Sequence, residues 1–201
     1  MRLITIFVTL ILSTAGAWAS ELDRAVAALP GSKAQFSQRF TPRGFKTSQT
    51  ESGSVIFGTL PLMRWSYTSP EEKLFVFDGT RSWFYVPAEK QATVTALDES
   101  KRSALPFLVL GDSAGRERNF VVKENWRGQS VITTLQPRSA GATIRNIAVS
   151  TDPFTHQLQR VEYTDRDGNK TAFDFATFQR VNAPAETFRF SAPAGVHVVQ
   201  Q

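Results

Sequence analysis

Short apolar segments separated by turn residues make up most of the chain after residue 34. They are rich in the β-branched and aromatic residues that strands prefer. The pattern predicts about eleven strands, over residues 34–41, 50–57, 62–68, 73–78, 81–87, 91–97, 118–124, 129–136, 142–151, 156–165 and 170–178. Tight-turn sequences at Asp78-Gly79, Arg127-Gly128 and Asp167-Gly168-Asn169 predict antiparallel hairpins.

A meander of so many strands is expected to curl. Parallel pairing would need crossover helices, and the sequence has no room for them between the strands. Open twisted sheets beyond about ten strands tend to curl, split or flatten. The pattern therefore predicts a mainly β fold, either a barrel or an unclosed half-barrel.

Two segments depart from the strand pattern. Residues 21–29 space their apolar side chains as an amphipathic helix does, and Pro30-Gly31 ends that helix. Asp98 is suited to cap a second helix, in which apolar residues crowd around Pro106 before Gly111. Because a proline interrupts it, residues 98–110 are expected to form a kinked or broken helix.

The N-terminus has the features of a signal peptide. Arg2 is followed by an apolar run, Leu3–Leu12, that is too short to span a bilayer. Ala17 and Ala19 flank Trp18 in the small-x-small pattern of a cleavage site. We therefore predict a signal peptide at residues 1–19, a single domain at residues 20–201, and a location in the bacterial periplasm.

Composition removes several classes of function. The chain has no cysteine, which excludes disulfides, thiolate chemistry and attachment of a lipid to an N-terminal cysteine. Its formal net charge of +5 is spread along the sequence without blocks, and an exported protein does not meet nucleic acid. A protein without an anchor can diffuse between membranes, and a monomer is expected.

The common catalytic arrangements are missing from the sequence. His156 and His197 lie in no metal or triad spacing. Asp165, Asp167 and Asp174 are explained by a turn and by a solvated strand face. We therefore predict no enzyme activity, no metal and no cofactor.

Aromatic residues are the most conspicuous feature of the predicted strands. Phenylalanine occurs 16 times, and several strands are apolar on both faces. Trp83 and Tyr85, for example, alternate with Phe84 and Val86. A packed β-sandwich core and a lined hydrophobic cavity would both produce this pattern, and the pattern alone leaves both open.

Several motifs resemble those of the LolA family, the periplasmic outer-membrane lipoprotein carriers. The match lies in Gly53–Phe57, Pro61–Tyr67 with Pro70, Asp78-Gly79 and Trp83–Tyr85. It continues in Phe36–Gln38, Pro106–Leu110, Asp167-Gly168, Phe188–Phe190 and Pro193–Val196, and so covers nearly the whole chain after the leader. The resemblance implies an unclosed antiparallel barrel of eleven strands, with helices forming a lid over a hydrophobic cavity.

The function implied by the resemblance is transport of an acylated lipoprotein from an inner-membrane exporter of the ABC type to an outer-membrane acceptor lipoprotein, without a cofactor. Together with the apolar strands, it predicts an acyl-chain site lined by Val55, Phe57, Met63, Trp65, Leu74, Val76, Trp83, Tyr85, Leu105, Phe107, Leu108 and Leu110. Met63 and the leucines suit adaptable packing.

One departure from the family pattern concerns gating. Family carriers have an Arg-Pro pair just before the aromatic strand, and the arginine is thought to hold the lid closed. Here Thr59 and Leu60 occupy those positions and the proline is Pro61, so Arg64 is the nearest substitute. The missing pair favours one alternative, a carrier for a glycolipid or lipid-linked pigment that works with another lipid exporter. A third hypothesis is a sensor of stray lipoproteins or lipopolysaccharide with a similar half-barrel, but such sensors carry a second domain for which this sequence leaves no room.

Overall fold

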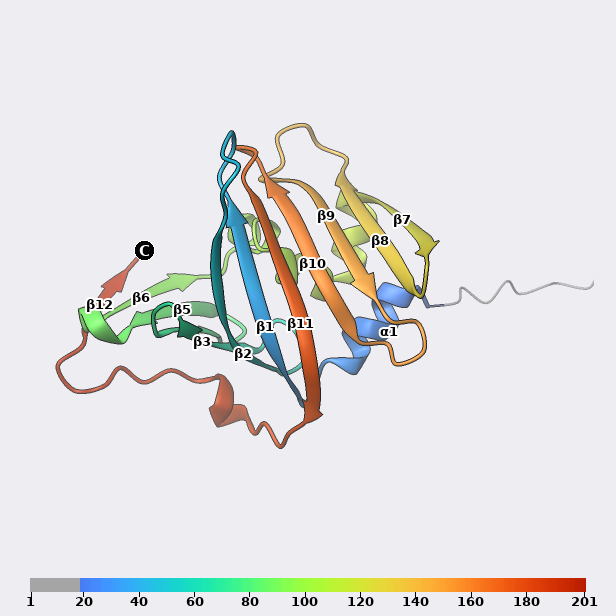
Figure 1. Cartoon of the computed structure of the whole chain (residues 1–201). Coiled ribbons are helices and arrows are strands. Elements are labelled where there is room, and N and C mark those ends of the chain that lie inside the picture. The colour runs from blue at the N-terminus through green and yellow to red at the C-terminus, as the bar shows by residue number, and fades with distance from the viewer. Residues whose placement is uncertain (1–18) are drawn as a thin grey trace, which may run out of the picture.

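A computed structural model describes residues 19–201, and within them twelve strands form one sheet (Figure 1). The predicted signal peptide covers residues 1–19, and all of it except Ala19 lies outside the described residues. The strands are β1 (Ser32–Thr41), β2 (Gln49–Phe57), β3 (Met63–Ser69), β4 (Lys73–Phe77), β5 (Arg81–Val86), β6 (Gln91–Ala96), β7 (Phe120–Arg127), β8 (Ser130–Pro137), β9 (Ile144–Thr151), β10 (Leu158–Asp165), β11 (Lys170–Arg180) and β12 (His197–Gln200).

The sheet consists of two antiparallel meanders, β1–β6 and β7–β11, with β12 added at one edge. Its order is β12-β6-β5-β4-β3-β2-β1-β11-β10-β9-β8-β7, so β1 and β11 connect the two halves. β7 and β12 are edge strands that do not pair with each other, so the curved sheet stays open. The prediction of an unclosed, mainly β fold is confirmed.

The predicted hairpins are also confirmed. Gly79, Gly128 and Gly168 all adopt positive φ angles, which a glycine accepts without steric cost. The eleven predicted strands match β1 to β11 with small shifts at their ends. The prediction missed β12, a four-residue strand that follows a long loop and pairs in parallel with β6.

Four α-helices accompany the sheet in the described residues: α1 (Glu21–Ala28), α2 (Glu99–Ser103), α3 (Pro106–Gly111) and α4 (Ser113–Asn119). The first helix and the broken second helix are confirmed. The prediction missed α4 and began the following strand too early, at residue 118. Asp112 caps α4 by accepting a hydrogen bond from the N–H of Gly115. The sequence of α4, however, has no apolar periodicity that would predict a helix.

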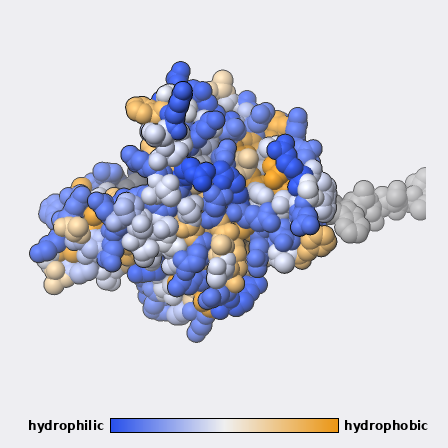
Figure 2. All heavy atoms as spheres, viewed as in Figure 1, coloured by the Kyte–Doolittle hydropathy of each residue, from blue (hydrophilic) through white to orange (hydrophobic). Residues whose placement is uncertain are grey.

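The helices lie on the concave side of the sheet, behind the strands in the view of Figure 1. The convex face in that view is mostly hydrophilic, with separate hydrophobic patches (Figure 2). One short 3₁₀ helix, η1 (Pro87–Glu89), joins β5 to β6, and another, η2 (Ala185–Phe188), follows β11. No helix in residues 19–201 has the length and apolar character needed to cross a bilayer.

The C-terminal segment explains why several strands are apolar on both faces. Phe190 packs on Trp83 and Tyr85, with ring centroids 5.3 and 5.5 Å apart, and Phe188 is buried. One face of β3–β5 therefore looks into the concave interior, and the other is covered by residues near the C-terminus.

Candidate functional site

The inner wall of the sheet begins with β2 and β3. Val55 pairs with Trp65 and Phe57 pairs with Met63, so all four side chains share one face. Each is at most 3% exposed. Strand alternation and register alone place these four predicted residues together.

A second group of aromatic side chains extends this wall across β1 and β11. Phe36 lies 5.0 Å from Trp65 between ring centroids, and Phe173 lies 5.2 Å from Trp65. Phe175 belongs to the same cluster. The sequence prediction omitted these three phenylalanines, although the alternation of Phe173 and Phe175 along one strand could have marked them as partners of Phe36.

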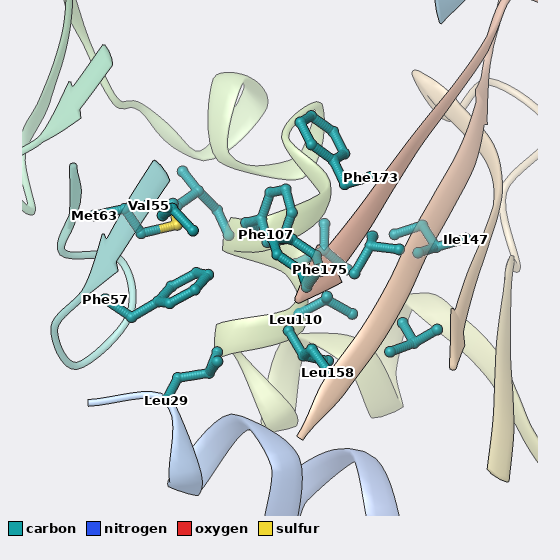
Figure 3. Close-up of a cluster of buried hydrophobic side chains, with 14 of the residues drawn as sticks. Leu29, Val55, Phe57, Met63, Phe107, Leu110, Ile147, Leu158, Phe173 and Phe175 are labelled. Carbon is teal, nitrogen blue, oxygen red and sulfur yellow. The ribbon is translucent and has the colours of Figure 1, made fainter. Parts of the chain in front are cut away.

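Helix α3 fills the space that this wall encloses. Phe107 lies 4.9 Å from Trp65 and 5.3 Å from Phe173, measured between ring centroids. Figure 3 shows Phe107 between Val55 and Met63 on one side and Phe173 and Phe175 on the other. The hollow expected beneath the lid is therefore occupied, in this structure, by side chains of the lid itself.

An open groove continues from the filled interior. It has a volume of about 430 Å³ and is bordered by Phe75, Phe77, Ser82, Trp83, Phe84, Thr93, Thr95, Leu105 and Gln201. Phe75 and Phe84 stack, with ring centroids 4.4 Å apart. Phe75, Phe77 and Leu105 also pack against the buried core, so the groove and the interior share a wall.

The strand register shows that four predicted site residues face away from the inner wall. Val76 pairs with Arg64 and Trp83, and Leu74 pairs with Tyr85, which places these side chains opposite the inner wall. The indole and phenol rings pack on the C-terminal segment, and the Trp83 indole N–H donates to Asp78. The predicted site residues Leu74, Val76, Trp83 and Tyr85 are thus separated from the group around Trp65.

The predicted site residues on α3, and Leu105 just before it, lie in three different environments. Phe107 and Leu110 face the core, and Leu110 is fully buried. Leu105 borders the groove. Leu108, although buried in the core cluster, also borders a second cleft outside α3.

Arg64, the predicted gating residue, makes no hydrogen bond or salt bridge to helices α1–α4 of the described residues. Its side chain lies on the outer face of β3 and donates to the carbonyl of Thr187 at 3.4 Å. Burial there lowers the pKa of its guanidinium. The arginine that does contact the lid is Arg116 on α4, which donates to the carbonyl of Leu110 and to the carboxylate of Asp23.

Three of the polar residues considered as catalytic candidates have structural partners. His156 lies 2.9 Å from the buried Glu21, and Asp174 accepts from Arg160. Asp165 accepts from Asn169 within a turn. Across residues 19–201, no three histidine, aspartate or glutamate side chains gather in a way that could hold a metal ion.

Comparison with known proteins agrees with this architecture. The family model described as outer membrane lipoprotein carrier protein LolA matches residues 28–191. An outer-membrane lipoprotein carrier protein from Nitrosospira multiformis is 32% identical over 173 residues, which cover 84% of this chain and 82% of the relative. The corresponding protein from Proteus mirabilis is 28% identical over 203 residues, covering 99% and 98%.

A solved structure shows the same fold at low sequence identity. An uncharacterized conserved protein from Thermus thermophilus matches with a TM-score of 0.53 and 16% identity, over 90% of this chain and 97% of the other. The family match, the relatives and the open twelve-stranded sheet lead to one conclusion. This chain belongs to the LolA family, whose members are carriers and not enzymes.

Proposed function

We propose that this protein carries lipoproteins through the periplasm to the outer membrane, and that it shields their acyl chains against the inner wall around Trp65. The names of the relatives support a lipoprotein cargo. The predicted signal peptide supports export from the cytoplasm. The expected donor is an inner-membrane lipid exporter, the expected acceptor is an outer-membrane lipoprotein, and the carrier works as a monomer.

A carrier is needed because acyl chains are poorly soluble in water. Burying one methylene group is worth about 0.8 kcal/mol, so leaving a chain of about sixteen carbons in water costs on the order of 10 kcal/mol. The carrier must offset most of that cost and still release its cargo. An interior that closes on itself when empty and opens when an acyl chain enters meets both needs.

The observation that carries the proposal is the insertion of Phe107 into the aromatic wall beside an open groove. An acyl chain that enters the groove alongside the stacked rings of Phe75 and Phe84 reaches the core at Leu105, which immediately precedes α3. If α3 swings out, the space that Phe107 held becomes available to the chain. Because one apolar group replaces another, the exchange costs little hydrophobic free energy.

Arg116 is the residue we propose to hold α3 in its closed position. It is 5% exposed, and it joins the last turn of α3 to Asp23 of α1. Movement of α3 away from the wall must break the hydrogen bond from Arg116 to the carbonyl of Leu110, so this bond stabilises the closed position. This assigns to Arg116 the closing role that the sequence prediction gave to Arg64.

The groove provides the test of acyl-chain binding. Phe84→Glu places a carboxylate on a half-buried position, where it stays hydrated and the fold is retained. The matched control is Phe154→Glu, because Phe154 is 80% exposed in a turn away from the groove. We expect Phe84→Glu to lose uptake of a purified triacylated lipopeptide, measured by mass spectrometry of the isolated complex, while the control binds like the unmodified protein.

Two outcomes would contradict the proposal: equal uptake by Phe84→Glu and the unmodified protein, or no uptake by the unmodified protein. Circular dichroism of both variants shows whether folding is intact. If Phe84→Glu does not fold, the milder Phe84→Gln takes its place against Phe154→Gln.

A second candidate cargo follows from Thr59 and Leu60, which stand where family carriers have Arg-Pro. A carrier for a glycolipid or a lipid-linked pigment would use the same wall and groove. Competition between the lipopeptide and a purified glycolipid distinguishes the two cargoes. A nearby lipid-exporter gene, with a second carrier of the family elsewhere in the genome, would favour the glycolipid.

A further inference from the structure

A second cleft lies outside the lid, between the helices and the loop that joins β8 to β9. Its volume is about 690 Å³, which is within the range of small-molecule sites. Residues from α2, α3 and α4 form one side, and residues 137–144 form the other. Neither the predicted acyl-chain site nor the closing role of Arg116 accounts for a cleft of this size.

Part of the cleft wall is apolar. Val109, Phe120 and Ile144 are each at most 7% exposed and border it, together with Leu60 and Leu108. Phe107 faces the aromatic interior, whereas the next two residues of α3 border the cleft. Helix α3 is therefore a wall shared by two separate spaces.

The rest of the wall carries excess positive charge. Arg102 borders the cleft, and its guanidinium donates to the carbonyls of Leu97 and Gly79, which neutralise no charge. Arg118 and Arg138 border it as well and are exposed. Within residues 19–201, no salt bridge joins any of these three arginines to a carboxylate.

The remaining charged groups of the cleft offset only part of the charge of these three arginines. Arg116 is paired with Asp23. Two carboxylates border the cleft, those of Glu99 and Asp112. Glu99 is exposed at the start of α2, and Asp112 is engaged as the cap of α4. The cleft thus combines an apolar floor with guanidinium groups that have no anionic partner.

We propose that this cleft binds an anionic amphiphile, with Arg102, Arg118 and Arg138 on its phosphate or carboxylate group and the apolar floor against the first part of its tail. Guanidinium groups bind such anions through charge-assisted, often bidentate hydrogen bonds. The apolar wall distinguishes this ligand from a free anion. While α3 is in its closed position, it separates this site from the acyl-chain site in the interior.

The test compares three probes on the full-length mature protein: monoacyl phosphatidylglycerol, monoacyl phosphatidylcholine and inorganic phosphate, with both lipids kept below their micelle concentrations. The doubly substituted variant Arg118→Gln/Arg138→Gln removes two free guanidinium groups. Arg127→Gln is the control, since Arg127 is an exposed arginine at the end of β7, outside the cleft. Affinities come from calorimetry, and amide chemical shifts locate the binding.

We expect the anionic lipid to bind at least about tenfold more tightly than the zwitterionic lipid, with shifts in residues 137–144. The double variant should lose this preference, and Arg127→Gln and Phe84→Glu should keep it. The preference should also weaken as salt is added, because exposed charges are screened. Retention of the preference in Phe84→Glu separates this site from the interior.

Four results would overturn the proposal. The two lipids could bind equally, the double variant could keep the preference, or the shifts could be confined to residues around Trp65. Binding of phosphate as tight as binding of the anionic lipid would also overturn it, because the apolar floor would then contribute nothing.

Discussion

Helices α1 and α3 both lie on the concave side of the sheet, but different interactions hold them there. The backbone N–H groups of Glu21 and Leu22 in α1 donate to the Glu124 carboxylate at 3.3 and 3.2 Å. The buried carboxylate of Glu21 contacts Arg24 and His156, both at 2.9 Å. Helix α3 begins at Pro106 without a side-chain cap, and its buried residues are all apolar.

The difference indicates which helix can move. Removing the hydrogen-bond partner of a buried charged group costs about 3 kcal/mol. Apolar contacts have no fixed direction and can be exchanged for contacts with another apolar group. Under the proposed function, an acyl chain would replace the apolar contacts of α3 with the wall, but it could not replace the hydrogen-bond partners of α1. We expect α1 to stay in place while α3 moves, once Arg116 releases its end.

The largest expected effect comes from a charge on the wall that α3 covers. Trp65→Glu places a carboxylate where the side chain is 3% exposed, and should lower the free energy of unfolding by about 3–5 kcal/mol. Trp126→Glu is the control, because Trp126 is 69% exposed. Urea unfolding measures both. Equal stability of the two variants would show that the wall is not packed as described.

A smaller effect is expected where α3 meets the β2–β3 loop. A Cβ atom added at Gly111 would lie 2.7 Å from the Cβ of Leu60, so Gly111→Ala should destabilise the closed position of α3 by about 1–2 kcal/mol. Because the clash involves Cβ, Leu60→Gly should relieve it and Leu60→Ala should not. A double-mutant cycle monitored by unfolding measures this coupling. Additive effects in both pairs would mean that the two segments do not touch.

The matching change for α1 is Glu124→Gln on β7, which weakens the acceptor for the N–H groups of Glu21 and Leu22. We expect a loss of about 1–2 kcal/mol, as for other helix caps, and faster hydrogen exchange in α1 but not in α3. Glu117→Gln on α4 is the control, since Glu117 is exposed. Faster exchange in α3 alone would reverse the assignment of the fixed and the movable helix.

The smallest effect concerns pH and the wall itself. The Tyr67 hydroxyl donates to Gln38 at 2.5 Å, and burial, followed by the Glu51 and Tyr163 side chains, raises the pKa of Tyr67 above its ordinary value of 10.0. A raised pKa favours the neutral form in the folded state, so its contribution is complete below about pH 10 and is lost as the pH rises further. Between about pH 9 and about pH 11, Tyr67→Phe should therefore lose less free energy of unfolding than the unmodified protein loses. Equal losses in the two proteins, measured by urea unfolding at each pH, would contradict this.

Much of the fold could be predicted from the sequence, because strand composition and turn residues are local signals. Asp78-Gly79 and Pro30-Gly31 marked a hairpin and a helix end correctly. Helix α4 was missed because Ser113–Asn119 is polar throughout, and β12 because it is short and depends on its pairing with β6.

The site was predicted less completely, because strand faces depend on partners that are distant in sequence. Trp83 and Phe84 are both large aromatic residues, and Trp83 is the one on the outer face, where its ring packs on Phe190 of the C-terminal segment. The role of Arg116 depends on its contact with Asp23, 93 residues away. The filling of the interior by Phe107 likewise depends on how α3 packs, which alternation along the strands does not describe.

Hydrogen exchange with and without bound triacylated lipopeptide tests most directly whether α3 gives way to cargo. We predict that binding increases exchange in residues 106–111 and leaves residues 21–28 as protected as before. Unchanged or stronger protection of α3 in the complex, or equal loosening of both helices, would contradict this account.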